Sequence, residues 1–393
     1  MAAPVLDIVP ERSPLGGPAA DHGKGRPSLL RPSSRSPNLA VSSPFRPLPV
    51  PASDSAFRPA WWLTNPHAST MWGKFFRTPP PLDARIERWD TPDSDVLDLV
   101  RLAAPPTAPT FLLLHGLEGS MRSHYAAGTL REAQRAGWQA NLLLFRSCNG
   151  ELNRAPRSYH SGETTDLAHV VGRLLDERPG TPLILAGVSL GANVLLKWLG
   201  EQGRDAVGRV QAAVAVSAPF DLARSCAQID RGLSRVYAWN FLKSLRSKAV
   251  EKIRQHPGIA DPARVLAARS LWSFDDAFTS VVHGFRDAAD YYYRSSSIRY
   301  LRDIRVPTLL LSARDDPFHP PEVLDDVARI AAGNPALHLE FPARGGHVGF
   351  VEGRSPARVT YYMERRIPEF AAAQLAMAGA QARSAMEGSP FGR

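Results

Sequence analysis

Hydrophobic positions along the chain alternate between short, almost uniformly apolar runs and longer segments in which apolar residues recur every three or four positions. A continuous apolar run of a few residues predicts a strand buried on both faces, and the wider spacing predicts a helix with one buried face. The expected strands lie at 111–114, 140–145, 183–186, 212–217, 308–311 and 337–341. The expected helices lie at 125–136, at 165–177 and directly after residue 189.

Two further segments, 85–89 and 96–102, flank Pro92-Asp93-Ser94 and predict a β-hairpin. Short apolar strands that alternate with helices are typical of a parallel sheet with helices on both faces. The sequence therefore predicts an α/β fold with a mostly parallel central sheet. The hairpin suits an antiparallel edge of that sheet.

Composition divides the chain into a domain and two tails. Residues 1–56 are rich in Pro, Ser, Gly and Arg and predict a disordered tail, because they bury too little apolar surface to offset the entropy of ordering. Residues 57–378 are expected to form the domain, and residues 379–393 a flexible C-terminal tail. Within the domain, the segment at about 219–305 is helical and aromatic without a central strand, and we expect a cap insertion there.

Charge and cysteine usage narrow the class of protein. The 393 residues carry a formal net charge of +9, but no nucleic-acid motif accompanies it, so we expect no nucleic-acid partner. No apolar run approaches the roughly 20 residues of a membrane-spanning helix. Cys148 and Cys226 show no metal-ligand spacing. These features favour a cytoplasmic protein without a metal or cofactor.

The candidate chemistry centres on Gly187-Val-Ser189-Leu-Gly191, between the expected strand at 183–186 and the following helical stripe. Glycines on both sides of a serine permit a turn too tight for larger residues, and the serine hydroxyl then projects at the amino end of the helix. A strand, a tight turn and a helix in this order are typical of a nucleophile elbow. We therefore expect Ser189 to be the nucleophile of a serine hydrolase.

A serine nucleophile needs a base within hydrogen-bond reach and an acid that orients the base. His347 follows Gly345-Gly346 after the last expected strand, and we expect it to be the base. Asp315 and Asp316 both follow the strand at 308–311. The Pro-Phe-His-Pro sequence after Asp316 favours Asp316 as the acid, with Asp315 as the alternative. All the candidates lie at carboxyl ends of strands, where open α/β sheets hold their sites.

The negative oxygen of an acyl-transfer intermediate needs backbone N–H donors. One donor is expected from Leu190, directly after the nucleophile. The other is expected from Leu117 in the loop His115-Gly-Leu-Glu-Gly119, where glycine lets the backbone approach a substrate closely.

The cap segment carries two further patterns. Its aromatic residues predict an apolar pocket for an acyl chain, and its excess of basic residues predicts peripheral contact with an anionic membrane. Core aromatics and a solvated basic face are the alternatives. The aromatic residues are Tyr237, Trp239, Phe241, Trp272, Phe274 and Phe278. The basic residues are Arg224, Arg231, Arg235, Lys243, Arg246, Lys248, Lys252 and Arg254.

An ordered set of motifs spans about residues 60–370. The chain resembles the YheT-like branch of the α/β-hydrolases, whose relatives include phospholipase and acylglycerol-lipase homologues. The motifs are Asn65-Pro-His-Ala-Ser-Thr70, His115-Gly-Leu-Glu-Gly-Ser120, Phe145-Arg-Ser-Cys-Asn-Gly-Glu151, Asn153-Arg154, Tyr159-His-Ser-Gly162, Gly187-Val-Ser-Leu-Gly-Ala-Asn193, Asp315-Asp-Pro-Phe318 and Gly345-Gly-His-Val-Gly-Phe350.

The resemblance implies an α/β-hydrolase fold and a carboxylic-ester hydrolase with a Ser-Asp-His triad. The substrate expected is a small-molecule acyl ester, acylglycerol and phospholipid-like esters included. Acyl transfer on the same scaffold and a non-catalytic binding module stay open as alternatives.

One motif group has two interpretations. Arg146, Asn153, Arg154 and segment 159–162 follow the strand at 140–145. Hydrogen bonding that orders a long loop is favoured over contact with a substrate headgroup.

Overall fold

The computed structural model of the protein describes residues 55–387. The N-terminal tail expected over 1–56 lies outside this range except for its last two residues, and residues 388–393 also lie outside it.

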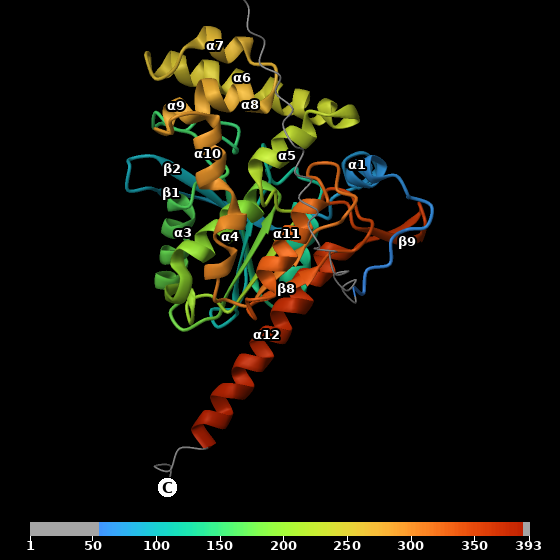
Figure 1. Cartoon of the computed structure of the whole chain (residues 1–393). Coiled ribbons are helices and arrows are strands. Elements are labelled where there is room, and N and C mark those ends of the chain that lie inside the picture. The colour runs from blue at the N-terminus through green and yellow to red at the C-terminus, as the bar shows by residue number, and fades with distance from the viewer. Residues whose placement is uncertain (1–54, 388–393) are drawn as a thin grey trace, which may run out of the picture. The chain divides into compact units, whose positions relative to one another are not determined.

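The described residues form an eight-stranded central sheet in the order β1-β2-β4-β3-β5-β6-β7-β8 (Figure 1). The pairs from β4 to β8 are parallel, whereas β2 runs antiparallel to both β1 and β4. This confirms the predicted mostly parallel α/β fold. The strands are β1 (Ala84–Asp90), β2 (Val96–Leu102), β3 (Thr110–Leu114), β4 (Gln139–Leu144), β5 (Leu183–Val188), β6 (Ala212–Val216), β7 (Thr308–Leu311) and β8 (Leu337–Glu340).

Helices cover both faces of the sheet, and every residue of β3, β5 and β6 is therefore buried. One core cluster joins Leu112 and Leu185 of the sheet to three helices, and a second cluster joins Leu113 and Ala186 to two others. The first three helices are α3 (Thr165–Glu177), α4 (Leu190–Gln202) and α11 (Glu322–Ala331). The other two are α2 (Ala126–Arg135) and α12 (Tyr362–Glu387).

Residues 219–305, which we call the cap, connect β6 to β7 and lie over one end of the sheet (Figure 1). The cap has a hydrophobic cluster of its own, which includes Leu242, Val265 and Phe278. Its α-helices are α5 (Leu222–Ile229), α6 (Arg235–Gln255), α7 (Pro262–Ala267), α8 (Leu271–Phe274), α9 (Ser280–Val282) and α10 (Ala288–Ser295).

Three further elements were not expected from the sequence. Helix α1 (Pro66–Phe76) precedes the sheet, and the hairpin of β9 (Val351–Ser355) and β10 (Arg358–Tyr361) follows β8. Helix α12 continues to Glu387, so the segment from Gly379, where a loose tail was expected, is helical over most of its length. None of the helices in the described range is long and apolar enough to cross a bilayer.

Candidate active site

Ser189 lies in the turn between β5 and α4 and has a φ of 54°, a left-handed conformation that a non-glycine residue rarely adopts. The two flanking glycines make the turn possible. A Cβ atom on Gly191 would lie 2.5 Å from the carbonyl oxygens of Leu114 and His115, and one on Gly187 would lie 2.5 Å from the Gly191 oxygen. The elbow geometry inferred from the motif is therefore present, with the serine side chain at the start of α4.

The structure brings Ser189, His347 and Asp316 together. His347 Nε2 lies 2.9 Å from Ser189 Oγ, and His347 Nδ1 lies 2.8 Å from Asp316 Oδ2. Burial alone would raise the pKa of Asp316, but attraction to His347 and to His319 outweighs it and lowers the pKa. An ionised Asp316 accepts the Nδ1 proton, which leaves the Nε2 lone pair facing the serine hydroxyl.

Asp315, the alternative acid, has a different partner. Its carboxylate accepts the backbone N–H of Gly346 at 2.8 Å. Burial raises the pKa of Asp315, and the neighbouring negative charge of Asp316 adds to this. Of the two aspartates, Asp316 is the one in contact with the imidazole.

Helix α1 holds the loop that carries His347. The backbone N–H of His347 donates to Thr70 Oγ1 at 2.9 Å, and Ser69 Oγ donates to the Gly345 carbonyl at 2.9 Å. A Cβ atom on Gly346 would lie 2.6 Å from the Pro66 carbonyl oxygen. The Asn65–Thr70 motif therefore positions the histidine loop, which the sequence analysis did not predict.

The two expected oxyanion donors lie beside the serine. A Cβ atom on Gly116 would come within 3.2 Å of Ser189 Cβ, so the loop that carries Leu117 runs directly past the nucleophile. Leu190 is the first residue of α4. Among the described residues, neither the Leu117 nor the Leu190 amide donates a backbone hydrogen bond. Both N–H groups are therefore free to bind an oxyanion.

A cavity of about 160 Å³ lies over Ser189 and His347. Leu117 and Leu190 form part of its floor, and Phe318 stacks on the His347 ring with centroids 3.9 Å apart. The cap supplies most of the apolar wall. Its contributions include Leu222, Ile229, Phe241, Leu245, Phe274 and Phe278.

The aromatic prediction for the cap is half right. Phe241, Phe274 and Phe278 line the cavity, but the prediction is wrong for the other three. The side chain of Trp239 is 62% exposed, because two positions along a helix turn a side chain to the opposite face. Trp272 is 41% exposed, and Tyr237 lies one turn before Phe241, with its hydroxyl 3.3 Å from His67 Nδ1.

A family model described as alpha/beta hydrolase fold matches residues 109–354, more than half of the chain. The chain belongs to the α/β-hydrolase family.

Several named relatives show which members of the family this α/β-hydrolase is similar to. The Escherichia coli (strain K12) protein "Putative esterase YheT" is 36% identical over 324 residues, which cover 81% of this chain and 94% of that protein. Phospholipase ABHD3 of Mus musculus is 30% identical, with 83% of this chain and 80% of its own length covered. Monoacylglycerol lipase of Saccharomyces cerevisiae (strain ATCC 204508 / S288c) is 28% identical, with 66% and 58% covered. The YheT-like resemblance predicted from the motifs is confirmed.

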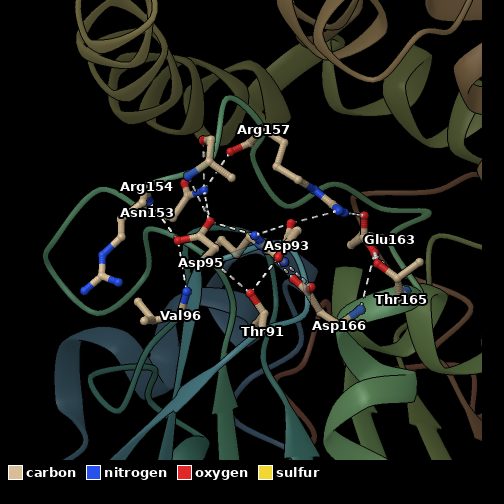
Figure 2. Close-up of polar contacts among 12 residues, drawn as sticks. Thr91, Asp93, Asp95, Val96, Asn153, Arg154, Arg157, Glu163, Thr165 and Asp166 are labelled. Atoms are coloured by element: carbon tan, nitrogen blue, oxygen red, sulfur yellow. Dashed lines mark hydrogen bonds and ion pairs between the residues drawn. The ribbon is translucent and has the colours of Figure 1, made fainter.

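In this α/β-hydrolase, Arg146, two residues after the end of β4, is the centre of a buried network. Figure 2 shows Asp95, Asn153 and Asp166 of this network. Its guanidinium pairs with Asp95 at 2.6 Å and with Asp166 at 2.7 Å. Asp95 also accepts the Asn153 side chain at 2.6 Å and the backbone N–H of Arg154 at 2.8 Å. These contacts agree with the interpretation that the polar residues order the loop. The side chains that would otherwise contact a substrate headgroup are hydrogen-bonded to one another.

We expect Asp95→Asn to destabilise the fold by about 3 kcal/mol at pH 7, because it removes one of the two buried carboxylates that pair with the Arg146 charge. Burial would raise the pKa of Asp95, but hydrogen bonds from Asn153 and three backbone amides lower it to about 2. The stabilisation is present above pH 4 and is lost as the pH falls from about 4 to about 2. Urea unfolding from pH 7 to pH 3 measures this trend.

The matched control is Asp90→Asn, since Asp90 is an exposed carboxylate in the same hairpin. It is expected to change the free energy of unfolding by less than about 0.5 kcal/mol. An Asp95→Asn protein as stable as the control would contradict the structural role of the network.

His160, Glu163 and His283 are able to bring three ligating atoms within 4.8 Å of one another, as a metal site requires. Internal contacts already use them. The Gly162 N–H donates to His160 Nδ1 at 3.1 Å, and Arg157 pairs with Glu163. Burial lowers the pKa of His160 well below its usual value. The His160 and His283 rings lie 4.4 Å apart, centroid to centroid, so this group joins the loop to the cap.

Proposed function

We propose that this protein hydrolyses carboxylic esters through an acyl-enzyme formed on Ser189. The observation that carries the proposal is the hydrogen-bonded chain Ser189–His347–Asp316 at the floor of an apolar cavity. The names of the relatives, an esterase, a phospholipase and a monoacylglycerol lipase, support the same reaction class.

In the proposed reaction, Ser189 Oγ attacks the ester carbonyl while His347 Nε2 takes its proton. The N–H groups of Leu117 and Leu190 bind the negative charge that develops on the carbonyl oxygen. His347 returns the proton to the departing alcohol, and the acyl group stays on the serine. Water, activated by the same nitrogen, then releases the acid, and Asp316 stabilises the imidazolium in both steps.

The cavity favours substrates whose acyl part is apolar. Two lysines in its wall are already engaged: Lys248 pairs with Glu118 at 2.8 Å, and Lys252 donates to the Asn153 and Ala155 carbonyls. Both ammonium groups are therefore already hydrogen-bonded within the protein. We propose acyl esters such as acylglycerols or phospholipid-like esters, with the acyl chain directed into the cap.

The cap surface supports a narrower membrane contact than the sequence predicted. Arg224 and Arg254 pair with nearby carboxylates, and Lys252 is buried. Around the start of α6, exposed apolar and basic side chains lie together. They are Leu233, Val236, Trp239, Arg231, Arg235 and Lys243. We propose this segment as the contact with an anionic bilayer, a combination typical of interfacial helices.

The two cysteines suit a reducing compartment. Cys148 and Cys226 are both free and buried. We therefore keep the cytoplasm as the proposed location.

We expect the hydrolysis rate to rise with acyl length from acetate to octanoate esters, by about tenfold per two or three buried methylene groups, because each removes apolar surface from water. A series of p-nitrophenyl esters measures this. Sedimentation with vesicles of anionic phospholipid, at low and high salt, is the paired measurement. Salt-sensitive binding that Lys243→Glu weakens supports the proposed membrane contact.

Product analysis in the presence of a competing alcohol checks that water, and not the alcohol, accepts the acyl group. Activity confined to acetate esters would contradict the acyl pocket. Vesicle binding that is absent, or that is insensitive to salt, would contradict the membrane contact while leaving the ester chemistry in place.

A further inference from the structure

Helix α6 of the cap is attached to the core by a polar stripe. Ser244, Lys248 and Lys252 follow one another at four-residue intervals and therefore lie on one side of the helix. All three bond to loops of the sheet domain, the first two to Glu118 and the third to backbone carbonyls. Phe241 and Leu245, on the adjacent stripe, line the cavity. The same helix thus closes the cavity and contacts the loop beside the nucleophile.

Glu118 receives donors from both the cap and the core. Its Oε1 atom accepts Lys248 Nζ at 2.8 Å and the Tyr159 hydroxyl at 2.9 Å, and its Oε2 atom accepts the Ser244 hydroxyl. The Tyr159 hydroxyl also accepts the Glu118 backbone N–H at 2.8 Å. Burial, together with Cys148 and Glu118, holds the pKa of Tyr159 well above its usual value, so this hydroxyl stays a donor. Side chain and backbone of Glu118 are therefore fixed together.

The backbone at Glu118 forms the turn that presents Leu117. The Gly119 N–H donates to the Gly116 carbonyl at 2.9 Å, which closes a four-residue turn with Leu117 and Glu118 at its centre. Glu118 has a φ of 54° at the third position, where glycine is the favoured residue. The Gly116 carbonyl also contacts His115 Nδ1 at 2.7 Å. Since this carbonyl belongs to the peptide that carries the Leu117 N–H, the turn sets the direction of that N–H.

We propose that Glu118 is a positioning residue that makes the oxyanion site depend on the docked cap. With α6 in place, Lys248 and Ser244 hold the Glu118 carboxylate, and the turn directs the Leu117 N–H toward the carbonyl oxygen of a substrate on Ser189. When α6 moves away, the turn loses two of its three side-chain donors and the Leu117 donor is no longer held. This inference rests on the proposed hydrolysis by Ser189.

The decisive variant is Glu118→Gly, because glycine accepts the positive φ without strain but removes the carboxylate. We expect kcat to fall about 10- to 100-fold with KM changed less than about threefold, since positioning of one oxyanion donor is lost. Lys248→Met and Ser244→Ala are each expected to lower kcat by a smaller factor than Glu118→Gly does. A trifluoromethyl ketone with an octyl chain forms a serine adduct that carries an oxyanion. We expect Glu118→Gly to weaken the binding of this ketone by the same factor by which it lowers kcat/KM.

Two variants on the exposed side of α6 are matched controls. Ser247→Ala and Glu251→Gln replace a serine and a glutamate that are exposed and do not contact Glu118. We expect both variants to keep the wild-type kcat and the wild-type affinity for the ketone. The thermal midpoint of each variant is measured alongside. Glu118→Gln should recover part of the activity, because its amide oxygen is able to accept from the Tyr159 hydroxyl and its NH2 group to donate to the Ser244 hydroxyl oxygen, although it cannot pair with Lys248 as a charge.

The outcomes separate this inference from the proposed function. Wild-type protein without Ser189-dependent ester hydrolysis would overturn both. An active wild type with a Glu118→Gly variant of equal kcat, or one whose loss lies entirely in KM with unchanged ketone affinity, would overturn the positioning role alone.

Discussion

Ser189→Ala is expected to lower kcat for ester hydrolysis by about 10⁴-fold or more, because no other group supplies the attacking oxygen. We expect His347 and Asp316, which lie 2.8 Å apart in the wild type, to keep their mutual hydrogen bond in this variant, because the change removes only one hydroxyl. The measurement is the rate of octanoate ester hydrolysis, with labelling by a fluorophosphonate probe of serine nucleophiles. Circular dichroism shows whether the variant is folded.

Ser280→Ala is the matched control for this change. Ser280 is a buried serine of the cap that does not line the cavity, so its hydroxyl has no place in the reaction. We expect its activity and probe labelling to equal those of the wild type. A folded Ser189→Ala protein with wild-type turnover would refute the proposed mechanism.

Asp316→Asn is expected to reduce kcat by about 10⁴-fold, since an asparagine cannot hold the imidazole in the tautomer that leaves Nε2 free to accept the serine proton. Asp315→Asn is its natural comparison. Asp315 accepts one backbone N–H from Gly346, and an asparagine oxygen is able to accept the same bond. We expect this second variant to lose less than about tenfold. The readout is kcat on the same octanoate ester.

The ranking of the two variants decides the assignment. A larger loss in Asp315→Asn would transfer the acid role to Asp315. Mild losses in both would remove the aspartates from the mechanism, because replacing a triad aspartate by asparagine lowers kcat about 10⁴-fold in a serine protease.

The parts of the site that depend on local sequence were predictable. A strand buried on both faces is a short apolar run, and the residue after it lies at the carboxyl edge of the sheet. Ser189 follows β5, Asp316 follows β7 and His347 follows β8. The choice of Asp316 over Asp315 also followed from local sequence, through the proline-rich segment that comes after it.

The parts that depend on distant contacts were not predictable from local patterns. Helix α1 reaches the His347 loop across 277 residues of sequence, through the bond to Thr70. From the sequence alone, the basic residues of α6 are typical of a solvated helix face. The contact between Lys248 and Glu118 is visible only in the folded chain. Trp239 was misplaced for a related reason, since aromatic content alone does not say which side of a helix faces the cavity.

The division of labour between sheet and cap has an evolutionary consequence. The side chains that we propose to react lie after strand ends scattered through the chain, whereas the apolar wall above them comes largely from one continuous stretch. Selection is thus able to change the preferred ester by substitutions within that stretch, while the reaction centre is inherited intact. The Glu118 contact limits this freedom. From the proposed role of Glu118, we expect that a cap transplanted onto this sheet domain without a hydroxyl and an ammonium at positions 244 and 248 gives an enzyme that binds new substrates but turns them over slowly.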